Sequence, residues 1–305
     1  MDLVSTPAAL RRWAVASLVG NMVIVVTGGL VRVTGSGLGC PTWPRCTADS
    51  YVPQAEANGH AYIEFGNRMI TFVLVVLAVG TLVAAWKARD DEGRPRRLVR
   101  GLALAAALGI PAQAVIGGVS VLTGLNPWAV GIHLLPSVAL IVLSVLLVHE
   151  TWPVAPVGVR PVVRGLVWLV SGLGLLVVLL GIVVTGAGPN SGDGGAARNG
   201  LDLTVAARVH SLSVWAVIAV TIALLVLTRG DRAQRAVWLL FGVELGQGLV
   251  GYLQYFLALP PALVALHMLG TTLFTAALAN LWWLTRTRDQ KISGSTAAAM
   301  NTIAR

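Results

Sequence analysis

Apolar residues occur along this chain in long blocks, without the alternation expected of strands or the polar faces of soluble helices. A block of about 20 apolar residues is what an α-helix needs to cross the ~30 Å hydrocarbon core of a bilayer. Eight such blocks can be counted, at about 13–33, 62–86, 98–121, 129–149, 163–186, 205–228, 236–257 and 261–284. The pattern predicts an all-α membrane protein with eight transmembrane helices.

Composition and charge agree with this prediction. The chain is 56% hydrophobic and only 11% charged, which is unusual for a soluble domain. Of the 22 Lys and Arg residues, 17 fall in segments on the same side as the N-terminus; the other five are Arg32, Arg45, Arg68, Arg198 and Arg208. Because cytoplasmic segments carry the excess of Lys and Arg, we expect both termini in the cytoplasm. The net charge of +9 therefore reports topology and not a nucleic-acid partner.

The two halves of the chain are similar in sequence. Residues 113–133 and 247–267 align without a gap, matching Gln113 with Gln247, Gly117 with Gly251, Pro127 with Pro261 and His133 with His267. "VVTGG" at 25–29 likewise matches "VVTGA" at 183–187. The repeat predicts two tandem four-helix bundles, 1–150 and 151–305, related by a pseudo-twofold axis along the membrane normal.

Two histidines of the second half fall at the same predicted depth. His210 and His267 lie roughly 9 Å inside the outer boundary, on the sixth and eighth blocks. Ionisable groups in a membrane are normally paired or ligated, although two separate core histidines bonded to backbone carbonyls remain an alternative. Zinc would need further ligands, which this level lacks. Two axial imidazoles among glycines suit a six-coordinate haem, with Arg208 near a propionate; those glycines could equally serve close helix packing.

The first half departs from this arrangement. The counterpart of His210 is Asn67, a poor iron ligand, so only His133 is kept. Glu64 lies on the same helical face as Asn67 and could act on protons, or could simply pair with Arg68 four residues later. These residues predict an open site with one histidine, one amide and one carboxylate. Arg32 and Arg68 are candidates for binding propionates or, alternatively, interfacial anchors.

Other polar residues in apolar surroundings have more than one interpretation. Cys40 and Cys46 lie in an outer, oxidising segment and could close a disulfide, although two free thiols are the alternative. Glu244 falls near mid-bilayer, where Gln247 could satisfy it or where it could handle protons. His149 ends the fourth block at the inner face and is typical of an interfacial residue.

At these residues the chain resembles the haem A synthases of aerobic respiration, a bacterial family of eight-helix membrane enzymes. The resemblance covers residues 13 to 284. It rests on "TGGLVRVTGSGLGCP" at the end of the first helix, "IEFGNR" at the start of the second, the tandem layout, and the histidines at 133, 210 and 267. Many family members carry a histidine where this chain has Asn67.

The resemblance implies an oxidoreductase that converts a methyl group of haem O to a formyl group, making haem A for cytochrome c oxidase. It implies haem b as cofactor, with His210 and His267 as axial ligands, and a Cys40–Cys46 pair. The substrate haem would lie in the first half, near Glu64 and His133. The implied location is the cell membrane with the haem sites toward the outer face, and haem O synthase and an electron donor or acceptor are the implied partners.

Two other classes of protein compete with this interpretation. A b-type cytochrome exchanging electrons with quinone would predict two equivalent bis-histidine sites, which Asn67 disfavours. A tandem-repeat transporter would predict broken helices with polar residues near the midplane, whereas most of the polar groups here cluster in the outer third.

Overall fold

The computed structural model describes residues 6–54, 59–152 and 155–286. These residues form eight helices, each long and apolar enough to cross a membrane. They are α1 (Pro7–Val33), α2 (Gly59–Lys87), α3 (Arg97–Leu122), α4 (Pro127–Thr151), α5 (Pro161–Ala187), α6 (Leu203–Leu227), α7 (Gln234–Phe256) and α8 (Pro261–Thr285). The predicted class and all eight segments are confirmed. Residues 287–305 of the second predicted bundle lie outside the described residues.

Local chemistry explains where the helices begin. Proline occupies the first turn of α1, α4, α5 and α8, where the missing N–H costs no helical hydrogen bond. The side chains of Thr6, Asn126 and Asp202 accept hydrogen bonds from the first turns of α1, α4 and α6. The Thr6 cap with Pro7 starts α1 six residues before the apolar block that predicted it.

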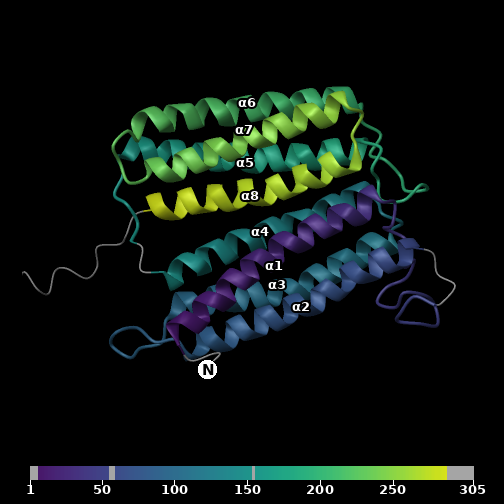
Figure 1. The fold of residues 1–305 in the computed structure, drawn as a ribbon, viewed down its shortest axis with the longest axis horizontal. Helices are drawn as coiled ribbons and strands as arrows, with labels where there is room; N and C mark the ends of the chain where they lie inside the picture. The colour runs from purple at the N-terminus through teal and green to yellow at the C-terminus, as the bar shows by residue number, and fades with distance from the viewer. Residues whose placement is uncertain (1–5, 55–58, 153–154, 287–305) are drawn as a thin grey trace, which may run out of the picture.

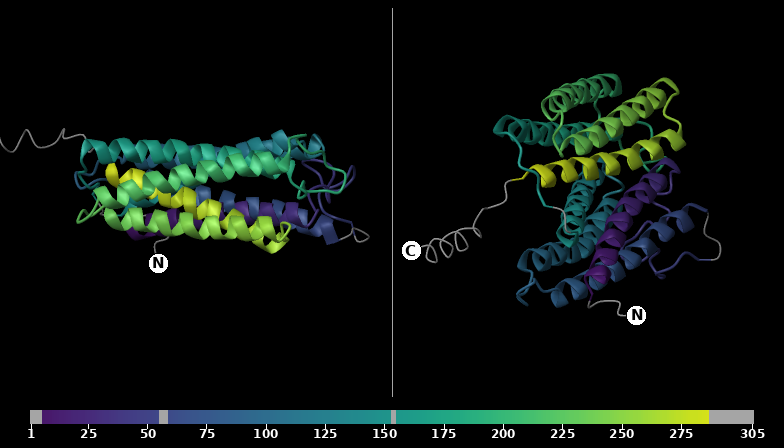
Figure 2. Two further views of the ribbon diagram at one scale, coloured as in Figure 1. Left: turned by 90° about the horizontal axis from the view of Figure 1, so that it is seen from above. Right: turned by 60° about the vertical axis from the view of Figure 1, so that its left-hand side comes forward.

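The helices gather in two groups, α1–α4 and α5–α8, which meet where α8 lies beside α1 and α4 (Figures 1 and 2). The longer connections, 34–54 and 188–202, lie at the same end of the molecule, opposite the start of α1 (Figure 1). We call this end the outer end, following the charge distribution. The side of the membrane that it faces, and the symmetry axis relating the two groups, remain predictions.

Apolar packing and buried hydrogen bonds hold the groups together. Leu74, Ile110 and Leu140 pack in the first group, and Val170 and Leu240 pack in the second. Polar side chains also cross between helices of the first group: Ser17 bonds to Thr81 at 2.9 Å and Asn21 donates to Ser144 at 3.2 Å. Small polar residues of this kind let membrane helices approach closely and satisfy each other.

At the inner end, aromatic and charged contacts connect α4 to α8. The His149 ring stacks on Trp283 with ring centres 4.2 Å apart, and its Nε2 lies 2.9 Å from the Asn280 side-chain oxygen. Next to them Arg286 pairs with Glu150 at 2.6 Å. His149 is therefore part of the junction between the two helix groups, a role that its position at the inner face did not reveal.

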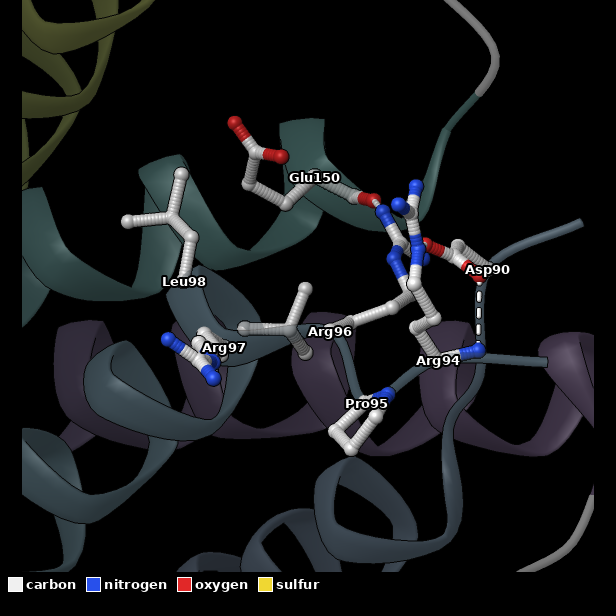
Figure 3. Close-up of a pocket in the computed structure, with 8 residues that line it drawn as sticks. Asp90, Arg94, Pro95, Arg96, Arg97, Leu98 and Glu150 are labelled. Atoms are coloured by element: carbon white, nitrogen blue, oxygen red, sulfur yellow. Dashed lines mark hydrogen bonds and ion pairs between the residues drawn. The ribbon is translucent and has the colours of Figure 1, made fainter. Parts of the chain in front are cut away.

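A surface pocket at the same end joins the α2–α3 connection to α4 (Figure 3). Arg94 pairs with Asp90 at 3.1 Å and with Glu92 at 2.8 Å, and Arg96 donates to the backbone carbonyl of Glu150. The backbone N–H of Arg94 is the main cause that holds the pKa of Asp90 below its usual value. Arg94 and Arg96 thus fix this connection.

Candidate functional site

A cavity of about 660 Å³ lies within the first helix group, toward the outer end. Five residues singled out from the sequence of the first half line it together: Arg32, Glu64, Asn67, Arg68 and His133. The wall is not made by α1–α4 alone, because residues of α5 and α8 also line the cavity. The cavity therefore reaches the junction between the two groups, which the division into two bundles did not predict.

His133 is held on α4 by its neighbours on α3. Its Cε1 lies 3.2 Å from where a Cβ on Gly117 would stand, so the absence of a side chain at Gly117 lets the ring lie against α3. The Gln113 amide lies 3.2 Å from both Nδ1 and the backbone carbonyl oxygen of His133. The ring is thereby positioned at the cavity wall.

Asn67, on α2, also lines the cavity and is hydrogen-bonded to α1. Its side-chain oxygen accepts a hydrogen bond of 2.7 Å from the Thr27 hydroxyl. An amide anchored in this way supplies polarity to the wall without supplying an imidazole. The two halves therefore differ here as the sequence predicts: the first half has the Asn67 amide where the second half has the His210 imidazole.

Glu64 and Arg68 form an ion pair of 2.6 Å, as their i,i+4 spacing predicts. The Glu64 side chain is almost fully buried, and its second oxygen accepts a 2.7 Å hydrogen bond from the backbone N–H of Cys40. Arg68 in turn donates to the carbonyls of Cys40, Thr42 and Arg45 at 2.9, 3.0 and 3.1 Å. The spacing revealed the pair but not these backbone contacts, which tie α2 to the preceding loop.

That loop, residues 40–52, contains a disulfide between Cys40 and Cys46, and we call it the disulfide loop. Trp43 and Tyr51 of this loop line the cavity. The Trp43 ring lies so close to Gly118 of α3 that an added Cβ would collide with it. The disulfide loop therefore covers part of the cavity and is held there by Glu64, Arg68 and Gly118.

We expect both cysteines to resist thiol labelling in intact, unreduced membranes, because the structure joins them. After reduction under denaturing conditions, both should label fully. Quantitative labelling of both cysteines before reduction would contradict the disulfide. The masses of peptides from unreduced protein provide an independent check.

Arg32, at the end of α1, lines the cavity and lies close to the connection between α5 and α6. One terminal nitrogen donates to the Asn190 carbonyl at 2.9 Å, whereas the buried Nε has no hydrogen-bond partner among the described residues. A buried guanidinium with a free donor is suited to a carboxylate.

In the second group His210 of α6 and His267 of α8 lie near each other, and both side chains are partly buried. Each ring lies against a glycine: a Cβ on Gly181 or Gly251 would stand 3.4 Å from the Cε1 of His210 or His267. The Nδ1 atom of each ring is buried without a hydrogen-bond partner among the described residues. The pair is therefore placed together with unused ring nitrogens. Arg208 is exposed, two residues before His210.

Glu244 is buried on α7, but its partner is not the one expected. Its Oε1 accepts a 2.8 Å hydrogen bond from Thr221 of α6, and its Oε2 has no partner among the described residues. Gln247 instead donates to the His267 carbonyl at 3.1 Å. The expectation that Gln247 satisfies Glu244 is wrong because the amide reaches across to α8.

Fold and site together define a multi-pass α-helical membrane protein with a partly buried histidine pair in one helix group and a large cavity bearing a single histidine in the other. Within the described residues, no group of three or more His, Cys, Asp or Glu side chains is placed to hold a metal ion. The chain belongs to the family described as cytochrome oxidase assembly protein, which matches residues 11–190, more than half of its length.

Several relatives carry the name Heme A synthase. The protein from Listeria welshimeri is 32% identical over 145 residues, 46% of this chain and 46% of the relative. The protein from Bacillus pumilus is 30% identical over 183 residues, 59% and 58% of the two chains. The protein from Lysinibacillus sphaericus is 34% identical over 145 residues, 46% and 45%. The chain spans about half the length of the relatives that it matches.

Proposed function

We propose that the protein is a haem A synthase that oxidises a methyl group of haem O to a formyl group, supplying haem A to cytochrome c oxidase. The observation that carries the proposal is the pairing of two unlike sites in one family member. One is a partly buried histidine pair, and the other is a cavity lined by one histidine and one carboxylate. The relatives' name, Heme A synthase, supports the same reaction.

The second half, residues 151–305, holds haem b through His210 and His267. The residues fit such a group because both rings retain a buried, unpartnered nitrogen and both lie against glycines that leave space beside them. Bound there, haem b would supply electron transfer, a chemistry for which two histidine ligands are suited. Arg208, exposed near the outer end of α6, would supply positive charge for a propionate.

The first half, residues 1–150, binds the substrate haem in the cavity. His133 on α4 would hold its iron, and Asn67 on α2 offers an amide to the cavity in place of a second imidazole. Arg32 and Arg68 both line the cavity and supply positive charge for the propionates. Glu64 accepts and returns a proton at its carboxylate, while the disulfide loop excludes water at the outer end of the cavity. Glu64 and His133 are thus the catalytic residues of the proposed reaction.

Topology and partners follow from the same proposal. Both termini lie in the cytoplasm and both sites lie toward the outer face of the cell membrane, in agreement with the excess of Lys and Arg at the inner end. Haem O synthase supplies the substrate, and an electron carrier exchanges electrons with haem b.

The test is expression in a bacterial strain that makes haem O but lacks haem A. We expect haem A in the extracted pigments, together with the spectrum of a low-spin haem in the purified protein. Haem O that stays unconverted, with that spectrum present, would instead indicate a b-type cytochrome. A colourless protein would favour a transporter.

We expect Asn67→His to be tolerated, with haem A output close to that of the unaltered chain. The substitution adds a second imidazole to the cavity wall, as in many members of the family it resembles, and removes the hydrogen bond with Thr27. Pigment analysis and the absorption spectrum together check this. Substrate haem trapped in a six-coordinate state without oxidation would show that the amide is required.

A further inference from the structure

One helix, α8, forms a wall shared by the two sites. The His267 ring lies against Gly251 of α7, inside the second group. The next residue, Met268, lies against Gly29 of α1 and lines the cavity of the first group. Successive residues of an α-helix point about 100° apart, so His267 points into the second group while Met268 points toward the cavity.

The contact between Met268 and Gly29 is close, and the internal repeat has no equivalent of it. A Cβ on Gly29 would stand 3.1 Å from the Met268 Cγ, so α1 accepts this side chain because it has none of its own there. At the offsets of the internal repeat, Leu134 corresponds to Met268 and Ala187 to Gly29. The other half therefore does not repeat the Gly–Met combination. Methionine is unbranched and flexible, so it can adjust to whatever fills the cavity.

The backbone beside Met268 is tied to the histidine site. The His267 carbonyl accepts hydrogen bonds from the Gln247 side chain at 3.1 Å and from the Thr271 hydroxyl at 3.0 Å. Neighbouring Cα atoms are about 3.8 Å apart, so a displacement at Met268 acts on this hydrogen-bonded segment directly. The cavity and the histidine ring are thus separated by a single peptide unit, the one between His267 and Met268.

We propose that Met268 is a positioning residue that contacts the substrate macrocycle and transmits occupancy of the cavity to His267. This inference rests on the proposed function, since it requires a haem held by His210 and His267 and a second macrocycle in the cavity. Met268 belongs to the half that holds haem b, so the substrate site is completed by a residue from outside residues 1–150.

The test uses the purified protein with its bound haem and zinc protoporphyrin as the probe for the cavity. Zinc protoporphyrin takes a single axial ligand, which matches His133, and its fluorescence reports binding separately from the haem iron. Electron paramagnetic resonance of the low-spin haem reports the geometry of the His210–His267 pair. We expect zinc protoporphyrin to shift this signal in the unaltered protein.

Met268→Ala and Leu266→Ala make a matched pair, because both residues flank His267 but Leu266 is exposed and does not line the cavity. Both variants should keep the haem. Met268→Ala should bind zinc protoporphyrin more weakly and lose the shift at saturating probe, whereas Leu266→Ala and the conservative Met268→Leu should retain it. The shift persisting in Met268→Ala, or its absence from the unaltered protein with probe bound, would overturn the inference. Failure of zinc protoporphyrin to bind at all would instead contradict the proposed substrate cavity.

Discussion

Replacing His210 or His267 with alanine is expected to reduce bound haem by at least about tenfold, while the protein still inserts into the membrane. The loss corresponds to at least about 1.4 kcal/mol of binding free energy. Each variant removes one of the two neighbouring imidazoles of the second helix group, and the remaining histidine cannot supply two axial bonds. Haem content per protein, measured from the spectrum of its pyridine complex, checks this.

His60→Ala provides the matched control for this pair. His60 lies at the outer start of α2, where its Nδ1 is 2.9 Å from the Ser36 hydroxyl, and it takes no part in the histidine pair. It should retain haem at the level of the unaltered chain. A normal low-spin spectrum in His210→Ala or His267→Ala would remove that residue from the proposed ligand set.

Glu64→Gln is expected to leave haem b intact and to slow haem O oxidation by about a hundredfold or more, the scale associated with losing a general acid–base group. Glutamine keeps the shape of the side chain and can still accept from the Cys40 N–H, but it has no carboxylate to take up a proton. Haem O or a half-oxidised haem should accumulate in the extracted pigments. Unchanged haem A output would leave Glu64 as a structural partner of Arg68.

Arg68→Lys separates the chemical role of Glu64 from its role in holding the disulfide loop. Lysine keeps the positive charge beside Glu64 but cannot reproduce the guanidinium contacts with three loop carbonyls. If Glu64 acts on protons, Arg68→Lys should retain much more turnover than Glu64→Gln. Equal loss in both variants, together with faster proteolysis of the loop, would assign the defect to loosening of the loop.

The sequence predicted the helices well because membrane crossing imposes a strong local pattern. Long apolar blocks, first-turn prolines and side-chain caps act within a few residues of each other. The candidate cavity residues were also predictable, since the aligned repeat located His133 and the difference at Asn67. These side chains line one cavity, and their roles remain proposals.

The contacts that the sequence did not reveal all join segments far apart in the chain. The bond between Thr221 and Glu244 and the stacking of His149 on Trp283 depend on how the helices rotate against each other. Apolar blocks that are hydrophobic all round carry little information about that rotation. The same reason explains why the contribution of Met268 to the cavity became apparent only in the structure.

The most direct test of the proposed activity follows haem O over time in isolated membranes that contain the protein, using chromatography of the extracted pigments. The account predicts that haem O declines as haem A rises in matching amount, and that membranes carrying Glu64→Gln convert little although their haem b spectrum is unchanged. Haem O that remains unconverted in membranes with a normal low-spin haem spectrum would contradict the proposed synthase and indicate a haem protein that only carries electrons.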